Sequence, residues 1–375
     1  HVAPRELRRR RVRWVRLPDR HRRLRLNRAS PICTATMRAV WIRKHGGPGV
    51  LEVRETVDPI AGPGEVRVQA RACGLNFAEI SARQGIYPAA PKPPCVVGYE
   101  GAGVVDQVGE GVDDIAIGAR VLFVSRFGGH SDRVVVARYM LVPIPDALDF
   151  PEAAALPVNY LTAYQMLFRL RRIEPGDRVL VHAAAGGVGT AVLQLCQTVD
   201  DVTTFGTASA SKHDHVRAQG CTHPIDYHSK DYVDAVEELT NGEGVDLVCD
   251  ALGGADWKKG YSLLRPSGML VCFGLANASK AGKRSLVRVA GQLLRTPRFG
   301  PMGLMGDNRS VAGLDLGSLW GHEAKIQEGL RKVVGFWETG AARPHIDGTY
   351  AFDDAAQAHE RLERGKNVGK VLLVP

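Results

Sequence analysis

Residues 178–196 read RVLVHAAAGGVGTAVLQLC, and this stretch decides the fold. Its first part, Val179–His182, is apolar and predicts a short strand. A turn of small residues follows. Val188, Val192 and Cys196 then recur four residues apart, which is typical of one face of a helix. A strand that enters a helix through a glycine-rich turn is the arrangement of a dinucleotide-binding site.

The turn matches the dinucleotide fingerprint as A-x-G-x-x-G, with alanine in place of the first glycine. Gly186 has no side chain, so the backbone there can approach a pyrophosphate closely, and Gly189 lets the helix pack tightly on the strand. The start of the helix offers free N–H groups to an anion. The alternative is a glycine turn made for packing alone. The predicted cofactor contacts in this turn are Ala185, Gly186, Gly187, Val188 and Gly189.

The next predicted strand, Val202–Gly206, indicates which dinucleotide binds. A site for NAD normally has an acidic residue about 20 residues past the glycines, where it binds the ribose hydroxyls. This chain has Thr207, Ala208 and Ser209 there, so no carboxylate would repel a 2′-phosphate. Lys212 and Ser209 could bind that phosphate through charge-assisted hydrogen bonds, and Tyr227 could stack or donate to it. The pattern favours NADP(H), although a solvated lysine is the alternative interpretation of Lys212.

The surrounding chain alternates strands and helices. Helices are predicted at Lys212–Gln219, closed by Gly220, and at Tyr232–Leu239. Strands are predicted at Val245–Cys249 and Met269–Phe273. This alternation predicts an α/β fold with a doubly wound parallel sheet.

The chain before and after this region has a different pattern. From Met37 to about Val158 short apolar runs are separated by turn residues; for example, Val66, Val68 and Ala70 alternate with polar residues as in a half-buried strand. This part is expected to form a compact antiparallel β domain. Residues 310–375 predict helices near Glu323–Thr339 and Asp353–Arg364 and a strand at Lys370–Val374. We expect this end to fold back on the first domain.

The net charge of +9 comes from one end of the chain. Residues 1–36 contain twelve Arg and two acidic residues, a net charge of +10, which leaves −1 for the other 339 residues. A basic groove for nucleic acid is therefore not implied. The Arg-rich segment is expected to be a disordered extension, with an organellar transit peptide and an RNA-binding segment as alternatives.

Two further observations concern location. No stretch approaches the roughly 18 consecutive apolar residues of a membrane span. The seven cysteines contain no C-x-x-C pair, and several lie in apolar, strand-like contexts. Buried reduced thiols of this kind are typical of a cytoplasmic protein.

The segments ACGLNFAEISARQGIY, GYEGAGVV, VNYLTAY, HAAAGGVGTAVLQLC, FGTASASKH, HPIDYH and GKNVGKVLLVP together carry a resemblance. Residues 37–375 resemble the medium-chain dehydrogenase/reductase superfamily, in its quinone oxidoreductase (zeta-crystallin) branch, and most of all the vesicle amine transport protein homologue subgroup. The resemblance implies a GroES-like catalytic domain at 37–162, completed by 315–375, a Rossmann domain at 163–314, and a homodimer.

The resemblance also bears on zinc. Zinc-dependent relatives carry Cys, His and Cys as catalytic ligands, and the matching positions here are Asn76, Tyr99 and Asn159. Zinc prefers thiolate, imidazole or carboxylate ligands, so we expect no metal. Without a Lewis acid, the expected reaction is reduction of a quinone or an α,β-unsaturated carbonyl, with neutral donors stabilising the oxygen that gains charge.

The candidate donors are Asn76, Tyr87 and Tyr99. Asn76 and Tyr87 line the pocket by resemblance; a turn cap for Asn76 and core packing for Tyr99 are the structural alternatives. The resemblance further implies cofactor contacts from Thr162, Phe273, Gly274 and Asn367.

Residues 280–298, KAGKRSLVRVAGQLLRTPR, contain six basic residues and no acid. They predict either a surface helix beside the cleft or dimer contact, or a basic amphipathic helix that makes a peripheral membrane contact. An NADPH-binding scaffold or lipid-interacting protein with little turnover is therefore the second functional hypothesis. A polyketide-type enoyl reductase is a third, disfavoured by the absence of flanking synthase domains.

Overall fold

The computed structural model describes residues 35–279 and 286–375, without the side chains of 286–288. The elements below belong to one compact unit, Thr36–Pro375. The expected extension at 1–36 lies outside the described residues except for its last two positions. Among the described residues, no helix is both long and apolar enough to cross a membrane.

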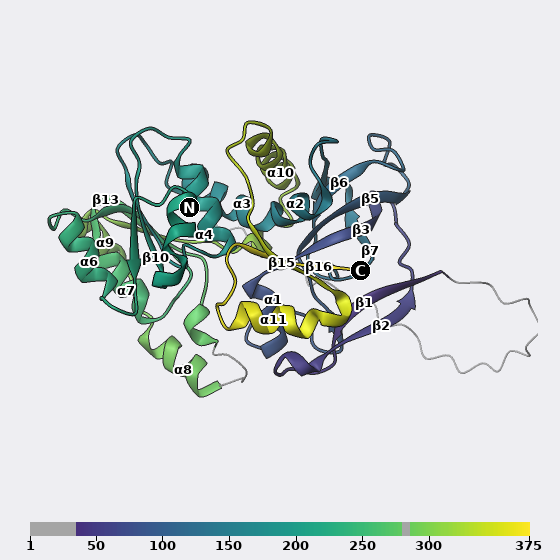
Figure 1. Ribbon diagram of the computed structural model, residues 1–375, viewed down its shortest axis with the longest axis horizontal. Helices are drawn as coiled ribbons and strands as arrows, with labels where there is room; N and C mark the ends of the chain where they lie inside the picture. Colours follow the sequence, from purple (N-terminus) through teal and green to yellow (C-terminus); the bar gives the residue numbers. More distant parts are fainter. Residues whose placement is uncertain (1–34, 280–285) are drawn as a thin grey trace, which may run out of the picture. The chain divides into compact units, whose positions relative to one another are not determined.

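Six parallel strands form the sheet that the glycine motif predicted, seen at the left of Figure 1. Their order is β11-β10-β9-β12-β13-β14, so the chain reverses direction across the sheet between β9 and β12. Ligands of such sheets bind at the carboxyl ends of the strands beside this reversal. The strands are β9 (Arg178–Val181), β10 (Thr203–Ala208), β11 (His223–Asp226), β12 (Val245–Asp250), β13 (Leu264–Cys272) and β14 (Ser310–Gly313).

The helices that connect these strands largely confirm the sequence predictions. The helix predicted at Tyr232–Leu239 has those bounds, but the one predicted at Lys212–Gln219 is a short 3₁₀ turn followed by α5, ended by Gly220 at φ +98°. Strand β13 begins five residues before Met269, because Leu264 pairs with Val245 and the chain then bulges around Ser267 at φ +69°. The helices are α4 (Gly187–Cys196), α5 (His213–Ala218), α6 (Tyr232–Leu239), α7 (Ala255–Ser262), α8 (Leu286–Arg295) and α9 (Pro301–Asp307).

A second sheet of seven strands confirms the predicted β-rich part. Its order is β15-β16-β3-β5-β6-β8, and β7 also pairs with β3. The alternation predicted at Val66, Val68 and Ala70 lies in β3, where all three side chains are buried. The strands are β3 (Glu65–Leu75), β5 (Glu100–Val108), β6 (Arg120–Val124), β7 (Arg133–Ala137), β8 (Leu141–Pro143), β15 (Ile346–Ala351) and β16 (Lys370–Val374).

The chain end folds back on this sheet, as predicted, because β16 pairs antiparallel with β3. A third sheet, β2-β1-β4, consists of β1 (Thr36–Ile42), β2 (Leu51–Val57) and β4 (Cys95–Val96). The helices of this part are α1 (Phe77–Gln84), α2 (Phe150–Ala155), α3 (Pro157–Tyr164), α10 (Glu323–Glu338) and α11 (Ala355–Glu363). Helix α3 continues into a π-helical segment, Gln165–Leu170.

Helix α3 joins the two larger sheets. The buried Tyr160 hydroxyl donates to the Gln194 side chain of α4 over 2.6 Å. Gly369, just before β16, donates to the carbonyl of Ala185 in the glycine turn over 2.7 Å. These contacts place residues of both sheets beside the predicted cofactor turn.

Candidate active site

The glycine turn has the geometry that a dinucleotide requires. Gly186 is the N-cap of α4, and no side chain among the described residues caps this helix, so its first N–H groups can face an anion. A Cβ on Gly189 would lie 2.5 Å from the carbonyl oxygen of Ala183 and 2.6 Å from Cα of Ala184. The helix can approach the turn this closely only because residue 189 is glycine. The residues present therefore fit a bound pyrophosphate.

Thr207, at the end of β10, supports this turn from inside the protein. Its buried hydroxyl lies 3.1 Å from Nδ1 of His182 and accepts the N–H of Ala183 over 3.3 Å. Ser209 and Tyr227 lie beyond it on the surface, where the Tyr227 side chain is 52% exposed. Ser209 Oγ lies 3.4 Å from Ser211 Oγ, and the Tyr227 ring lies 4.3 Å from the His228 ring, whereas the buried Thr207 hydroxyl is held by His182 and Ala183.

Lys212 is half-buried and connects the nucleotide-binding sheet to the chain end. It is therefore not the solvated lysine of the alternative interpretation. Its ammonium donates to the carbonyls of Gly365 and Asn367 over 2.6 and 2.8 Å. Burial lowers the pKa of Lys212. An ammonium carries three protons, so one remains for an anionic ligand.

The other predicted cofactor contacts lie at neighbouring loops or helices. Phe273 and Gly274 follow β13, and the Phe273 N–H donates to the carbonyl of Asp250 over 3.0 Å. A Cβ on Gly274 would lie 2.7 Å from the carbonyl oxygen of Ala251, so this turn also requires glycine. The buried Thr162 hydroxyl donates to the Val158 carbonyl, and the Asn367 amide donates to the Gly369 carbonyl. Their contact with a cofactor stays a prediction.

Asn76 is the N-cap of α1 and lies in a buried polar network. Its side-chain amide donates to Glu100 over 2.8 Å and, more weakly, to Glu79 over 3.4 Å. Its side-chain oxygen accepts from the Lys370 ammonium over 2.6 Å, and Lys370 also forms an ion pair with Glu100. Both amide protons of Asn76 therefore point at carboxyl groups, and neither is free for a substrate oxygen in this arrangement.

The three positions that match zinc ligands do not fit a zinc ion. Asn76 is bonded as above, and Asn159 donates to the Ala155 carbonyl and lies against Gly187. Amides and a phenol are poor zinc ligands, and the Lys370 ammonium already supplies the positive charge beside Asn76. Among the described residues, no group of three or more His, Cys, Asp or Glu side chains could hold a metal ion.

Glu79 completes this network from the first turn of α1. Its carboxyl accepts the backbone N–H of Asn76 over 2.9 Å and lies 3.9 Å from Nε2 of His130. Burial raises the pKa of Glu79 to about 8, despite the opposing influence of Lys370. Burial also lowers the pKa of His130 to about 4, so its ring is neutral at pH 7.

Tyr87 and Tyr99 form an aromatic wall beside the network. Their rings meet edge to face at 6.3 Å, and Phe127 lies 5.5 Å from Tyr99. The Tyr87 hydroxyl lies 3.4 Å from the Asp315 carboxylate, and burial raises the pKa of Tyr87 to about 12. The buried Tyr99 hydroxyl has no hydrogen-bond partner among the described residues. Among the three predicted donors, Tyr99 is thus the one whose buried O–H group has no partner in the described part of the chain.

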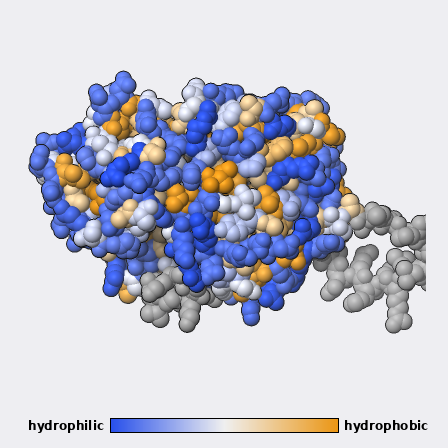
Figure 2. Space-filling view, in the orientation of Figure 1, coloured by the Kyte–Doolittle hydropathy of each residue, from blue (hydrophilic) through white to orange (hydrophobic). Residues whose placement is uncertain are grey.

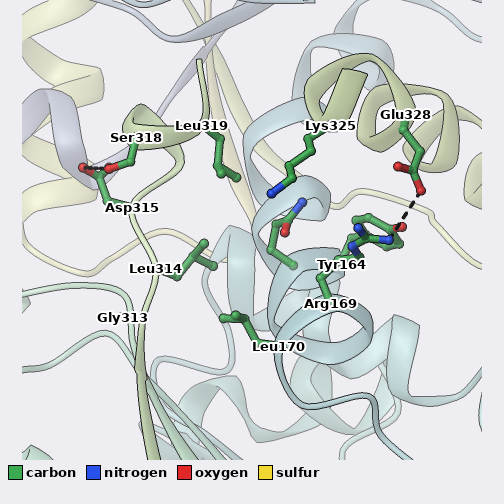
Figure 3. Close-up of a pocket in the computed structure, with 11 residues that line it drawn as sticks. Tyr164, Arg169, Leu170, Gly313, Leu314, Asp315, Ser318, Leu319, Lys325 and Glu328 are labelled. Carbon is green, nitrogen blue, oxygen red and sulfur yellow. Dashed lines mark hydrogen bonds and ion pairs between the residues drawn. The ribbon is translucent and has the colours of Figure 1, made fainter. Parts of the chain in front are cut away.

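A separate cavity of about 360 Å³ lies between α10, the π-helical segment and the chain after β14 (Figure 3). Arg169 and Glu328 face each other across one side of it at 3.6 Å. Its lining contains none of the predicted site residues, and only Asp315 connects it to Tyr87. This cavity is therefore separate from the residues predicted to bind the cofactor and the substrate.

Two family models match this chain. Residues 62–146 match the alcohol dehydrogenase GroES-like domain, and residues 219–373 match the zinc-binding dehydrogenase model. The human synaptic vesicle membrane protein VAT-1 homolog is 46% identical over 325 residues, which are 87% of this chain and 82% of that protein. The chain belongs to the quinone oxidoreductase branch of the medium-chain dehydrogenase/reductase superfamily.

Other members of this branch agree with the identification. A quinone oxidoreductase from Pseudomonas aeruginosa is 34% identical over 335 residues, 88% of this chain and 97% of that protein. The solved structure of Escherichia coli quinone oxidoreductase complexed with NADPH matches with a TM-score of 0.80 at 28% identity, over 90% of this chain and 100% of that chain. The human VAT-1 homolog-like structure matches with a TM-score of 0.79 at 34% identity, over 91% and 98% of the two chains. The resemblance and the two-part fold predicted from sequence are therefore confirmed.

Sequence reasoning missed three residues that contact the predicted site residues: Glu79, Asp315 and Lys370. Glu79 could have been found, because Asn76 followed three residues later by Glu is a helix-start signature. Lys370 and Asp315 carry no local signal, since Lys370 meets Asn76 and Asp315 meets Tyr87 only in the folded chain.

Proposed function

We propose that this chain is a zinc-independent, NADPH-dependent reductase of quinones or α,β-unsaturated carbonyls, acting as a homodimer in the cytoplasm. The observation that carries the proposal is the closed network of Asn76, Glu100 and Lys370 beside the glycine turn. In a zinc-dependent relative, the side chains at this place must be free to bind the ion. Here the Asn76 amide protons point at carboxyl groups, and its oxygen accepts from the ammonium of Lys370, which is also paired with Glu100.

In this proposal the glycine turn, Ser209, Lys212 and Tyr227 bind the cofactor. The N–H groups at the start of α4 would face the pyrophosphate, and Lys212 would bind the 2′-phosphate with its remaining proton. When bound, NADPH supplies a hydride from C4 of its nicotinamide. Tyr99 orients the acceptor and donates a hydrogen bond to the oxygen that gains negative charge. Tyr87 and Phe127 exclude water from one side of the pocket.

The decisive experiment measures NADPH oxidation, by loss of absorbance, with a panel of quinones and enones. We expect turnover with at least one acceptor, and we expect it to be unchanged after dialysis against a chelator that removes zinc. A matched zinc-dependent alcohol dehydrogenase serves as the positive control for the chelator. NADPH binding without oxidation by any acceptor would contradict the enzyme proposal, and loss of turnover on chelation would contradict zinc independence.

Substitution of Lys212 by alanine tests the cofactor preference. A hydrogen bond to a charged group contributes about 1.5–3 kcal/mol, so affinity for NADPH should fall about 10- to 100-fold. Affinity for NADH should change little, because that cofactor has no 2′-phosphate. Lys230→Ala, at a lysine paired with Glu238 on the surface, is the control. Equal losses for both cofactors, measured by fluorescence titration, would show that Lys212 acts only through its carbonyl partners.

A second candidate function is a lipid-interacting protein with little turnover, and exposed apolar side chains on two helices favour it. On α8 the Leu293 and Leu294 side chains are 62% and 87% exposed, and on α9 Met302 and Met305 are 75% and 69% exposed. The basic helix predicted at 280–298 ends at Arg295, two residues before Pro297, and residues 280–285 lie outside the described ranges.

Exposed Arg295 and Arg298 follow Leu293 and Leu294 in the chain, and basic residues beside exposed apolar ones are typical of segments that bind anionic membranes. Elsewhere, the face in Figure 2 is mostly hydrophilic with small, scattered apolar patches. Sedimentation with phosphatidylserine vesicles, compared with phosphatidylcholine vesicles, separates this candidate from a purely enzymatic role.

A further inference from the structure

His182, the residue that follows β9, is a buried histidine that the proposed mechanism does not use. It is 1% exposed. Its Nδ1 lies 3.1 Å from the Thr207 hydroxyl group, and its Nε2 lies 3.9 Å from a carboxyl oxygen of Asp250. Thr207 lies near the end of β10 and Asp250 ends β12, so the three side chains connect the carboxyl ends of three neighbouring strands. This edge of the sheet, beside the reversal of the chain, is where a dinucleotide binds.

The hydrogen bonds of Thr207 decide which nitrogen of His182 carries the proton. Burial lowers the pKa of His182, so its ring is neutral at pH 7 and one nitrogen accepts. The Thr207 oxygen accepts the Ala183 N–H over 3.3 Å, and among the described residues its own proton has only Nδ1 of His182 as an acceptor. A buried hydroxyl proton is costly to leave unpaired. Nδ1 is therefore the acceptor, and the ring proton lies on Nε2, toward Asp250.

Ala183 depends on this support, because its backbone lies in the left-handed region at φ +52°. Residues with a Cβ rarely adopt this conformation, and they keep it only where the surrounding structure holds them. The Ala183 carbonyl accepts the N–H of Gly186, the N-cap of α4, over 2.9 Å. It is also the carbonyl against which α4 packs at Gly189. The orientation of residue 183 therefore sets where α4 begins.

Two further contacts hold the His182 ring in place. The Tyr232 ring meets it edge to face at 4.6 Å. On the other side, one oxygen of Asp250 accepts the backbone N–H groups of Leu252 and Gly253 over 2.6 and 3.0 Å. Its second oxygen and Nε2 of His182 have no hydrogen-bond partner among the described residues, so each is the nearest polar group on record for the other.

We propose that His182 is a positioning residue for the cofactor. By accepting the Thr207 proton at Nδ1, it turns the oxygen of that hydroxyl group toward the Ala183 N–H and so fixes the glycine turn in the shape that receives the pyrophosphate. This inference rests on the cofactor site of the proposed function, and it adds a residue that does not itself touch the cofactor. If His182 only filled the core, its loss would lower the stability of the protein and leave the affinity of the folded protein for NADPH unchanged.

Two substitutions of His182 separate these roles. His182→Leu keeps a bulky side chain and removes both nitrogens, whereas His182→Asn keeps an acceptor at the same distance from the backbone as Nδ1. We expect the Kd for NADPH, from calorimetric titration well below the melting temperature, to rise about 10-fold in H182L, the effect of leaving one buried hydroxyl group unpaired. In H182N it should stay within about threefold of the wild type. Both variants should melt at a lower temperature, because each changes a buried side chain.

His359→Leu is the matched control. His359, on α11, is also fully buried, but neither of its ring nitrogens has a hydrogen-bond partner among the described residues. That variant should lose stability and bind NADPH as the wild type does.

A measurement on the cofactor-free protein gives an independent test and also serves if H182L does not fold. Thr207→Val removes the hydroxyl group and keeps the branched shape that suits a strand. Hydrogen exchange of the Ala183 amide, followed by NMR after ¹⁵N-alanine labelling, should be faster in T207V and in H182L than in the wild type or H182N.

Wild-type affinity in H182L, or a loss in H182N as large as that in H182L, would overturn the inference and leave the cofactor site intact. Unchanged exchange of the Ala183 amide in T207V would overturn it as well. A wild-type protein that does not bind NADPH would overturn the proposed cofactor site. One that binds NADPH without turnover would overturn the proposed reductase alone, because the role of His182 concerns binding.

Discussion

Replacing Lys370 with methionine is expected to destabilise the folded protein by about 3–5 kcal/mol, because it leaves the Glu100 carboxylate buried without a cation. Lys370 and Glu100 are 3% and 0% exposed, so water cannot take the place of the ammonium. Methionine keeps the length and the apolar stem of lysine, so the change tests the charge and not the packing. The free energy of unfolding from urea denaturation, together with the melting temperature, measures the effect.

Two variants make this prediction specific. Lys230→Met breaks the surface pair with Glu238, whose side chains are 44% and 72% exposed, and should cost at most about 1 kcal/mol. The double variant K370M/E100Q should be more stable than K370M alone, because it removes the unpaired carboxylate. If K370M costs no more than K230M, the network around Asn76 does not depend on an ion pair.

Substitution of Gly189 by alanine is expected to weaken cofactor binding strongly. The new Cβ would lie 2.5 Å from the Ala183 carbonyl oxygen and 2.6 Å from Cα of Ala184. Both are backbone atoms, so α4 must move away from the turn, and its N–H groups lose their alignment. Overpacking of this kind costs about 1–3 kcal/mol, and a cost of that size in the bound state lowers NADPH affinity about 5- to 150-fold.

Gly335→Ala is the matched control, because Gly335 also lies inside a helix but has nothing within 4 Å of an added Cβ. That variant should bind NADPH as the wild type does and gain about 0.5–1 kcal/mol of stability from the better helix former. Calorimetric titration with NADPH compares the two. Unchanged affinity in G189A would show that the turn adapts and that its glycine is not required for binding.

Much of the fold could be predicted from the sequence, because its signals are local. The parallel sheet follows from the strand, glycine turn and helix at 178–196, together with apolar runs such as β12, in which every residue is buried. The predicted ends of strands were less accurate where pairing with another strand decides them. Strand β13 begins before the predicted Met269 because Leu264 pairs with Val245. No short segment contains the information that fixes such a partner.

The candidate site also has one part that the sequence determines and another that only the tertiary structure determines. The sequence by itself determined the glycine turn, the missing acid after β10 and the absence of zinc-type side chains at 76, 99 and 159, because each is a property of one residue or of its close neighbours. Only the tertiary structure decided what Asn76 does. Its amide is bonded to Glu100, 24 residues away, and its oxygen to Lys370, 294 residues away.

Those contacts exist because β16 returns to pair with β3 and places Lys370 against the start of α1. The residues around this one buried ammonium are brought together by pairing between strands that lie far apart in the sequence. Neither the distances between these residues nor their burial can be predicted from the sequence near each of them.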